Sequence, residues 1–344
     1  MKNLLKILIP IAAVITALSL LPGLYPFVEE GDFKGDYRIP YSLGEDYFLF
    51  EKYCANTSSR DVIPVLGDSV IWGHYVHGGS TFTAGLNAMS GTPGFMNLGI
   101  DGIHPAAMYG LVNNFCRSIK NRRVIVGINL LWMSSPRHDL SGEVNSSINH
   151  GGLLPQFGGA IPAWDPPMEE RLTLVVRRDI PFFLWAGHVR AAMLAGGNFY
   201  AWTMENPRVS PLAYFSGEKG QFVPSDPVQP ERMVPRDMNW VGPGESVQWR
   251  YMLETVRLLK ARGNRVLAVI TPYNSFMLTE KSLLARDNMI GLMAAVLREE
   301  GIVTLAPVLD KREYFADLSH PGAEGYRLMA GYCMGNAAFI EFIR

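Results

Sequence analysis

The sequence is short of charge and of regular repeats. Only 18% of its 344 residues are charged, against about 25% in a typical soluble domain. The 31 basic and 32 acidic residues nearly cancel, and no dense cluster of lysine and arginine stands out, which argues against a nucleic-acid partner. Without a glycine period, a heptad or a low-complexity tract, the collagen, coiled-coil and disordered classes are excluded. What is left is an apolar chain long enough for one large domain or two modest ones.

Cysteine is also scarce. Cys54, Cys116 and Cys333 are the only three, and their spacing fits neither a zinc site nor a disulfide-rich scaffold. Cys116 falls on the apolar stripe of a predicted helix, which favours a place in the core. One disulfide is compatible with an oxidising compartment, although the odd count argues against a dedicated set.

Nucleotide-binding motifs are missing as well. The stretch Gly78-Gly79-Ser80 lacks the lysine and the spacing of a P-loop, and no Gly-x-Gly-x-x-Gly opens a helix after a strand. His74 and His77 lie three residues apart, but no further ligand follows at metal-binding spacing, so we interpret them as pocket-lining or structural. We therefore expect no nucleotide cofactor and no catalytic metal.

A long uncharged run near the N-terminus explains part of the apolar surplus. Residues 7–28 carry no charge, and about 20 apolar residues span a membrane as a helix. Two lysines precede the run and three acidic residues follow it, an order that keeps the N-terminus inside and exports the body. We expect residues 1–28 to be a transmembrane anchor. The alternative is a cleaved signal, because Ala17–Ser19 resembles a cleavage site. Both interpretations place the remaining chain outside the cytoplasm.

The rest of the chain is interpreted as a connector followed by one domain. Residues 29–60 have mixed polar and aromatic content and are taken as a juxtamembrane connector. From residue 61 to 344, short apolar runs alternate with helical stretches, which is the pattern of a parallel sheet covered on both faces. The predicted strands are 62–66, 95–98, 124–128, 266–270 and 302–305. The predicted helices are 80–89, 104–119, 245–262, 279–300 and one that starts at Pro321, since proline is favoured in the first helical position.

The alternation stops between residues 134 and 244. This stretch holds 13 of the 23 prolines, and a structureless loop of such length is improbable inside a compact domain. We interpret residues 134–244 as an insertion with helices at 169–177 and 182–194.

Polar residues cluster where the predicted strands end. In open parallel sheets, ligands bind beyond the carboxyl ends of the strands. The residues found there are Gly67-Asp68-Ser69-Val70 after the first strand, Asn97–Gly102 after the second and Gly127-Ile128-Asn129 after the third. Asp317-Leu318-Ser319-His320 precedes the last predicted helix.

These residues are the parts needed for acyl transfer. Ser69 can act as the nucleophile, His320 as the base that takes its proton, and Asp317 as the carboxylate that orients the imidazole. The backbone N–H groups of Ser69 and Gly99 and the side-chain amide of Asn129 can converge on an oxyanion. Each motif alone is weak, because aspartate, serine and glycine are common in turns and helix caps. The specificity lies in the four motifs occurring together and in order.

The four motifs resemble the blocks of the SGNH hydrolase superfamily, also called GDSL esterases. That family has a Gly-Asp-Ser block, an isolated glycine, a Gly-x-Asn block and a C-terminal Asp-x-x-His. The resemblance covers residues 61–133 and about 245–340. Val70 replaces the usual leucine, and Leu130 replaces an aspartate that many members carry.

The resemblance implies both a fold and a set of roles. The expected fold is a flavodoxin-like three-layer α/β/α sandwich with a parallel sheet. The implied catalytic residues are Ser69, Asp317 and His320, with Ser69, Gly99 and Asn129 forming the oxyanion hole.

Three other polar or aromatic residues receive local interpretations. His104 precedes a proline at a predicted helix start and is taken as local structure. Asp101 is taken as a turn or cap residue, with substrate contact as the alternative. Trp132 either lines the acyl or sugar pocket or is buried against the insertion.

The resemblance extends to a function. An anchored, exported SGNH domain resembles proteins that work beside membrane-bound O-acyltransferases, so we expect an esterase or O-acyltransferase acting on acyl groups, chiefly acetyl, of a cell-envelope polysaccharide. A membrane-bound O-acyltransferase is therefore a candidate partner. The alternatives are a lipid-directed esterase, such as a lysophospholipase or thioesterase, and a non-catalytic glycan-binding partner of an acylation complex.

Overall fold

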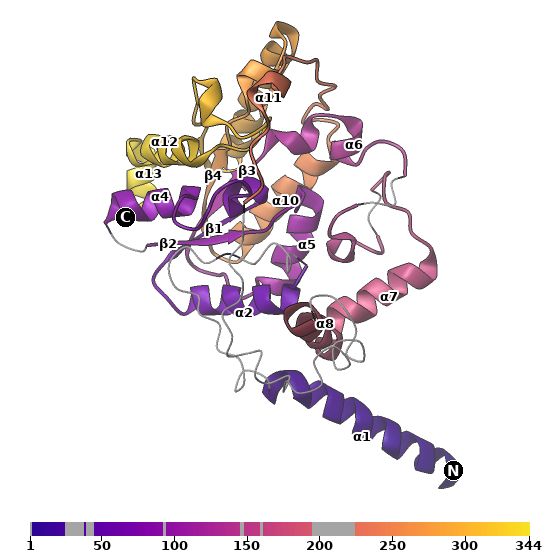
Figure 1. Cartoon of the computed structure of the whole chain (residues 1–344). Coiled ribbons are helices and arrows are strands. Elements are labelled where there is room, and N and C mark those ends of the chain that lie inside the picture. The colour runs from indigo at the N-terminus through magenta and orange to yellow at the C-terminus, as the bar shows by residue number, and fades with distance from the viewer. Residues whose placement is uncertain are drawn as a thin grey trace.

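The centre of the protein is one five-stranded sheet (Figure 1). The computed structural model describes residues 2–24, 38, 45–91, 94–144, 148–158, 161–194 and 224–344; parts of the expected anchor, connector and insertion lie outside these ranges. All strand pairs are parallel, in the order β2-β1-β3-β4-β5, which is the flavodoxin-like order. The strands are β1 (Ile63–Gly67), β2 (Phe95–Gly99), β3 (Arg123–Ile128), β4 (Arg265–Ile270) and β5 (Val303–Leu305).

The sheet is buried on both faces, as continuous apolar strands predict. Successive side chains of a strand point to opposite faces, so Val124 and Val126 join one hydrophobic cluster and Ile125 joins the other. On the first face lie α2 (Tyr47–Ser58), α5 (Pro105–Phe115), α10 (Val247–Ala261) and α11 (Glu280–Glu299). On the second face lie α3 (Ser69–Trp72), α4 (Phe82–Ser90), α12 (Ala323–Met334) and α13 (Ala337–Ile343). The α/β class with a central parallel sheet is therefore confirmed, and its helices form two outer layers (Figure 1).

Helix α2 differs from the connector expected at residues 29–60. Phe50, Tyr53 and Cys54 of α2 are fully buried in the cluster that holds α5. Cys54 also forms a disulfide with Cys116, the C-cap residue of α5. The aromatic residues of this stretch thus form the packing face of a helix, so the described part of residues 45–60 belongs to the domain.

The insertion contains the two helices that the sequence predicts. They are α7 (Met168–Asp179) and α8 (Pro181–Leu194), and a short α6 (Pro136–Asp139) precedes them. A small hydrophobic cluster fixes the start of the insertion against α5 and α10. The buried carboxylate of Asp139 adds to this, because it accepts hydrogen bonds from the backbone N–H groups of Val247 and Gln248, at 3.1 and 3.2 Å.

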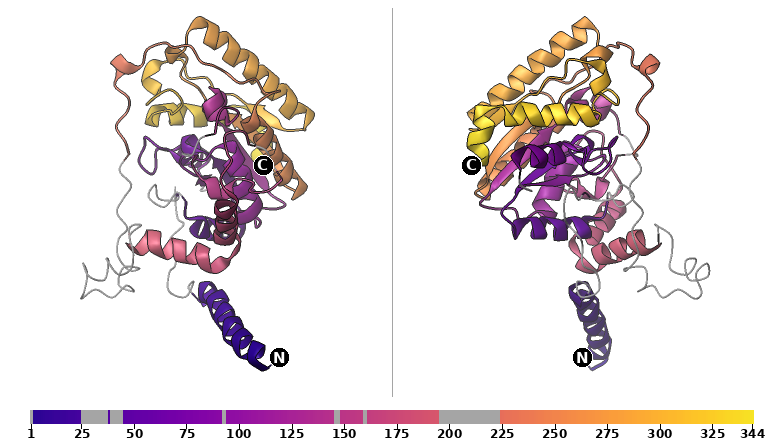
Figure 2. Two further views of the ribbon diagram at one scale, coloured as in Figure 1. Left: turned by 90° about the vertical axis from the view of Figure 1, so that its right-hand side faces the viewer. Right: turned by 60° about the vertical axis from the view of Figure 1, so that its left-hand side comes forward.

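The N-terminal segment forms a helix, α1 (Lys2–Leu24), which extends away from the sheet domain (Figures 1 and 2). Among the described residues, no helix is both long enough and apolar enough to cross a membrane.

Candidate active site

Ser69 is placed by a very close approach of α3 to the sheet. It is the first residue of α3, directly after β1. A Cβ at Gly67 or Gly127 would lie 2.2 or 2.5 Å from Ile71 Cγ1, and one at Gly99 would lie 2.4 Å from the backbone nitrogen of Trp72. Non-bonded atoms do not approach so closely, so these three positions must be glycine for α3 to rest on the strand ends.

The loop from residue 317 to 320 is built around Asp317. One oxygen of its carboxylate, Oδ1, accepts the backbone N–H groups of Ser319 and His320, both at 2.8 Å. The Asn274 amide, from the segment after β4, donates to the Asp317 carbonyl at 3.0 Å. These bonds fix the positions of Asp317 and His320 before any substrate binds.

The helix expected to start at Pro321 begins two residues later. Pro321 pairs with Phe315 in a short antiparallel bridge that closes the loop, and Gly322 is the N-cap of α12. The proline is therefore extended rather than helical, because closing the loop around His320 requires this conformation.

The fold brings Ser69, His320 and Asp317 into one hydrogen-bonded chain. His320 Nε2 lies 2.8 Å from Ser69 Oγ, across 251 residues of sequence. His320 Nδ1 lies 2.9 Å from both carboxylate oxygens of Asp317. With the Nδ1–H donated to Asp317, Nε2 is free to accept a hydrogen bond from the Ser69 hydroxyl, and this geometry suits a nucleophile, a base and an orienting acid.

Opposing effects set the protonation of this chain. Burial lowers the pKa of His320, but the hydrogen bond and charge of Asp317 and the charges of Asp68 and Asp101 outweigh burial, so the pKa lies above its ordinary value. Burial raises the pKa of Asp317, yet its hydrogen bonds and the charge of His320 hold that pKa below the ordinary value. The carboxylate is therefore more readily ionised than a free aspartate, and the imidazole holds its proton to a higher pH than a free histidine.

Asp68, next to the serine, ties the loops after β1 and β3 together. Its Oδ1 accepts the backbone N–H of Val70 at 3.0 Å, capping α3. Its Oδ2 accepts the Asn129 amide and the Trp132 indole N–H, both at 2.8 Å. Burial raises the pKa of Asp68. The charge of His320 and these three hydrogen bonds lower it, but they offset only part of the rise. Trp132 is thus held next to Ser69 by its bond to Asp68. This position favours pocket lining, one of the two alternatives that the sequence left open for it.

The expected oxyanion-hole donors lie beside Ser69, but two are already engaged. The Gly99 N–H donates to Asn97 Oδ1 at 3.0 Å, so the role predicted for it requires this bond to open. The Asn97 amide in turn donates to the Ile71 carbonyl at 2.9 Å. Asn129 uses one amide hydrogen for Asp68, and an amide group carries two.

Three residues near the triad were not assigned to it from the sequence. Tyr75 packs edge-on against the His320 ring, with centroids 5.3 Å apart. Burial, followed by the charge of Asp317 and a hydrogen bond to it, raises the pKa of Tyr75 to about 12. His74 lies 5.5 Å from His320 by ring centroids and bonds Asp101 Oδ1 at 2.7 Å. A usable signal existed, since His74 and Tyr75 follow the Ser69 helix and Asp101 lies in the loop after β2.

Arg38 fixes the turn that carries His74 and Tyr75. Its guanidinium donates to the carbonyls of Trp72, Gly73 and Val76 at 3.0, 2.7 and 2.8 Å. Gly73 adopts a left-handed conformation with φ of 89°, which lets the chain reverse at the end of α3. The turn is therefore held rigidly beside the triad.

The remaining histidine candidates have structural positions. His104 caps α5 through Nδ1, as interpreted from the sequence, and burial lowers its pKa to about 3, so the ring is neutral. His77 is exposed and is not part of the triad's contacts described above. Within the described ranges, no group of three or more histidine, cysteine, aspartate or glutamate residues is arranged to hold a metal ion.

Comparison with known proteins gives structural neighbours only. No protein-family model matches the chain, and no curated protein matches it in sequence. A lipolytic protein of the G-D-S-L family from Desulfitobacterium hafniense is similar in structure, with 10% identity and a TM-score of 0.38 over 79% of this chain and 97% of that one. A member of the same family from Veillonella parvula has 14% identity and a TM-score of 0.41, covering 80% and 97%. A GDSL-like lipase from Bacteroides ovatus has 13% identity and a TM-score of 0.36, covering 82% and 54%.

Proposed function

We propose that the protein is a serine esterase or acyltransferase that works through an acyl-Ser69 intermediate. The observation that carries the proposal is the chain of hydrogen bonds from Asp317 through His320 to Ser69. These residues come from opposite ends of the sequence and meet at the carboxyl edge of a parallel sheet, where such folds bind ligands. A buried histidine held by a carboxylate on one nitrogen and by a serine on the other is arranged for proton transfer.

The chemistry follows from this geometry. Ser69 Oγ attacks the acyl carbonyl while His320 Nε2 takes the hydroxyl proton, and the ionised Asp317 stabilises the resulting imidazolium. His320 then gives the proton to the departing alcohol, which leaves Ser69 acylated. A water molecule or a second alcohol loses a proton to His320, attacks the acyl-serine and releases the acid or a new ester.

Two donors are available for the proposed tetrahedral intermediate. The Ser69 N–H lies at the start of α3, and the second amide hydrogen of Asn129 belongs to a side chain that Asp68 holds in place. A fixed donor of this kind is worth about 3–4 kcal/mol to the transition state. Gly99 joins them when its bond with Asn97 opens.

We further propose small acyl esters, chiefly acetyl groups on an exported glycan, as the substrate. Ser69 and His320 are only 6% and 8% exposed, which favours a short acyl group over a long chain. The Cys54–Cys116 disulfide supports an oxidising, extracytoplasmic location, because cytosolic thiols are kept reduced. An exported location is where cell-envelope polysaccharide is found.

Labelling of the serine tests the proposed activity. A fluorophosphonate reacts only with an activated serine, so it should label the wild-type protein and not Ser69→Ala. The matched control is Ser59→Ala, which changes an exposed serine whose hydroxyl donates to the Asn56 carbonyl at the end of α2. No labelling of either protein would favour the non-catalytic glycan partner instead, and equal labelling of both would mean that the reactive serine is not Ser69.

Mass spectrometry of the acylated protein separates the substrate alternatives. Incubation with p-nitrophenyl acetate and with a long-chain p-nitrophenyl ester should give an acetyl adduct on Ser69 and little long-chain adduct. The reverse preference would support a lipid-directed esterase. Loss of the acetyl adduct with an added glycan, and recovery of acetyl-glycan, would identify a transferase rather than a hydrolase.

Cell fractionation tests the proposed location. Alkylation before reduction should leave Cys54 and Cys116 unmodified in protein taken directly from cells. Alkaline extraction separates a protein held in the membrane from a released one, and N-terminal sequencing of the mature protein detects a removed signal. Quantitative alkylation of both cysteines would contradict an oxidising location.

A further inference from the structure

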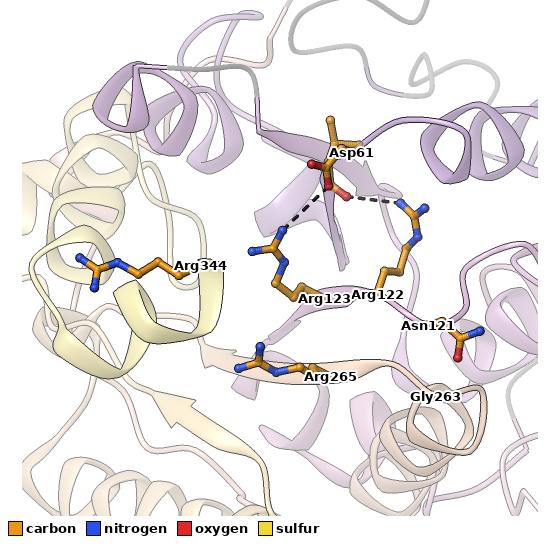
Figure 3. Close-up of a pocket in the computed structure, with 8 residues that line it drawn as sticks. Asp61, Asn121, Arg122, Arg123, Gly263, Arg265 and Arg344 are labelled. Carbon is orange, nitrogen blue, oxygen red and sulfur yellow. Dashed lines mark hydrogen bonds and ion pairs between the residues drawn. The ribbon is translucent and has the colours of Figure 1, made fainter.

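A pocket lined by arginines lies at the opposite edge of the sheet from Ser69. Its volume is about 400 Å³, and it is formed where β1, β3 and β4 begin (Figure 3). Four of its lining residues are basic and one is acidic; the complete lining is Asp61, Val62, Asn121, Arg122, Arg123, Gly263, Arg265 and Arg344. The acylation chemistry makes no use of this pocket.

Two of the arginines occupy adjacent positions on the sheet. Arg123 and Arg265 are register partners on the neighbouring parallel strands β3 and β4. Backbones of paired strands are roughly 5 Å apart and partner side chains share a face. Like charges in such positions repel each other, so an anion bound between them would lower this repulsion.

The acidic residue of the pocket supplies little of that charge. Asp61 Oδ1 lies 3.9 Å from Arg123 Nη2, and the Asp61 side chain is completely exposed to solvent. Exposed ion pairs of this length contribute little because water and salt screen them. Figure 3 shows this one carboxylate between Arg122 and Arg123, so the lining has four guanidinium groups against a single acidic group.

The arginines are also held in place before any ligand binds. Arg122 donates to the carbonyls of Thr57 and Ser58 at the end of α2, and its Nε is buried with no partner among the described residues. Arg123 Nη1 donates to the Ile343 carbonyl, and Arg265 stacks 5.6 Å from the Phe342 ring centroid. Fixed guanidinium groups lose little freedom when they bind an anion, which favours affinity.

We propose that this pocket binds a phosphate group carried by a small organic molecule or a lipid. Guanidinium groups match the oxygens of phosphate in geometry and charge, and a dianion offsets two arginines where a carboxylate offsets one. A volume of about 400 Å³ lies within the ordinary range for small-molecule sites, about 300–1,000 Å³, so it accommodates more than the phosphate itself. A phosphate monoester is therefore the ligand class.

Calorimetric titration of the full chain tests the proposal. At low ionic strength, inorganic phosphate and glycerol 3-phosphate should bind the wild type, with the ester tighter, and added sodium chloride should weaken both. The Arg123→Gln/Arg265→Gln double variant should bind at least about tenfold more weakly, since each arginine is expected to contribute a charge-assisted hydrogen bond. Arg265→Gln alone serves where the double variant is unstable, because Arg265 is exposed.

The matched control is Arg257→Gln, on α10. Its guanidinium is already paired with Glu254 and Glu300, so phosphate binding should not change. Flotation with phosphatidylcholine vesicles, with and without phosphatidic acid, identifies the source of the phosphate. Arginine-dependent binding to the acidic vesicles indicates a lipid headgroup, and binding of glycerol 3-phosphate without vesicle binding indicates a soluble ester.

Three results would overturn the proposal. They are no binding of any of these probes, equal binding by wild type and the arginine variants, and binding of acetate or citrate as tight as that of phosphate. Circular dichroism of each variant establishes that it is folded. Because the readout is binding rather than ester hydrolysis, a negative result here leaves the proposed acylation at Ser69 untouched.

Discussion

The two edges of the sheet differ in how their charged side chains are paired. At the carboxyl edge, Asp68, Asp317 and His320 are buried or nearly so, and each is surrounded by donors or an opposite charge. At the amino edge, Arg123 and Arg265 lie side by side on paired strands with one exposed carboxylate nearby. The first edge is internally complete and prepared for proton transfer, whereas the second has a surplus of charge that an external anion can offset.

Ser69→Ala should give the largest effect at the carboxyl edge. Removing the nucleophile should lower kcat for p-nitrophenyl acetate by roughly 10⁴- to 10⁶-fold, with little change in the melting temperature. Steady-state kinetics and thermal unfolding measure the two quantities. Activity within tenfold of the wild type would show that another group attacks the ester.

Asp317→Asn should come next, with a loss of about 10⁴-fold in kcat. The amide no longer holds the imidazole with Nδ1 protonated and no longer stabilises the imidazolium. Tyr75→Phe provides the comparison, because it removes a neutral group that contacts Asp317 and should cost less than about tenfold. Equal losses in the two variants would mean that Tyr75 takes part in proton transfer.

Asp68→Ala should destabilise the fold by about 2–4 kcal/mol. It leaves the Asn129 amide, the Trp132 indole and the Val70 N–H without their acceptor, and each unsatisfied buried group costs about 1–3 kcal/mol. Relief of the buried charge, whose pKa is raised by burial, offsets part of this. Urea unfolding measures the difference, and Asp68→Asn, which keeps an acceptor oxygen, should lose less than Asp68→Ala.

The pH profile sharpens the comparison further. His320 must be neutral to accept the serine proton, and its pKa is raised, so kcat/KM should fall as the pH drops through a midpoint above the ordinary value of 6.5. The groups that set this midpoint are Asp317, Asp68 and Asp101, which raise it against burial. Asp101→Asn removes one negative charge and should move the midpoint to lower pH.

Asp61→Asn is the control for that profile, because this carboxylate lies at the amino edge. It should leave the midpoint where the wild type has it. A midpoint that moves equally in both variants would mean that overall charge, rather than the neighbours of His320, sets the protonation of the base.

Arg265→Gln should give the smallest effect, and it should stabilise the fold where Asp68→Ala destabilises it. Without phosphate and at low salt, removing one of two adjacent like charges should raise the free energy of unfolding by about 0.2–1 kcal/mol. Phosphate should raise the melting temperature of the wild type more than that of the variant. A clear destabilisation without phosphate would mean that the Phe342 contact outweighs the repulsion from Arg123.

Much of the sheet could be predicted because its strands are apolar on both faces. Residues 124–128, for example, form a continuous apolar run, which predicts a strand buried on both faces, and all five are buried in β3. Helix α2 could not be predicted from the sequence, because the contact of its aromatic residues with α5 is visible only in three dimensions. Pro321 was assigned to a helix from local preference, while the bridge to Phe315 overrides that preference.

By itself, the sequence determined the residue types of the site and their order along the chain. The local pattern of apolar and polar residues predicts these positions. Ser69 and Asn129 follow predicted strands, and Asp317 and His320 precede the last predicted helix. The tertiary structure decided how donors are shared between them. Whether Arg123 and Arg265 become neighbours, and so line one pocket, depends on the register of separate strands. Local pattern carries no information on register between distant segments, because it is set by packing across the whole sheet.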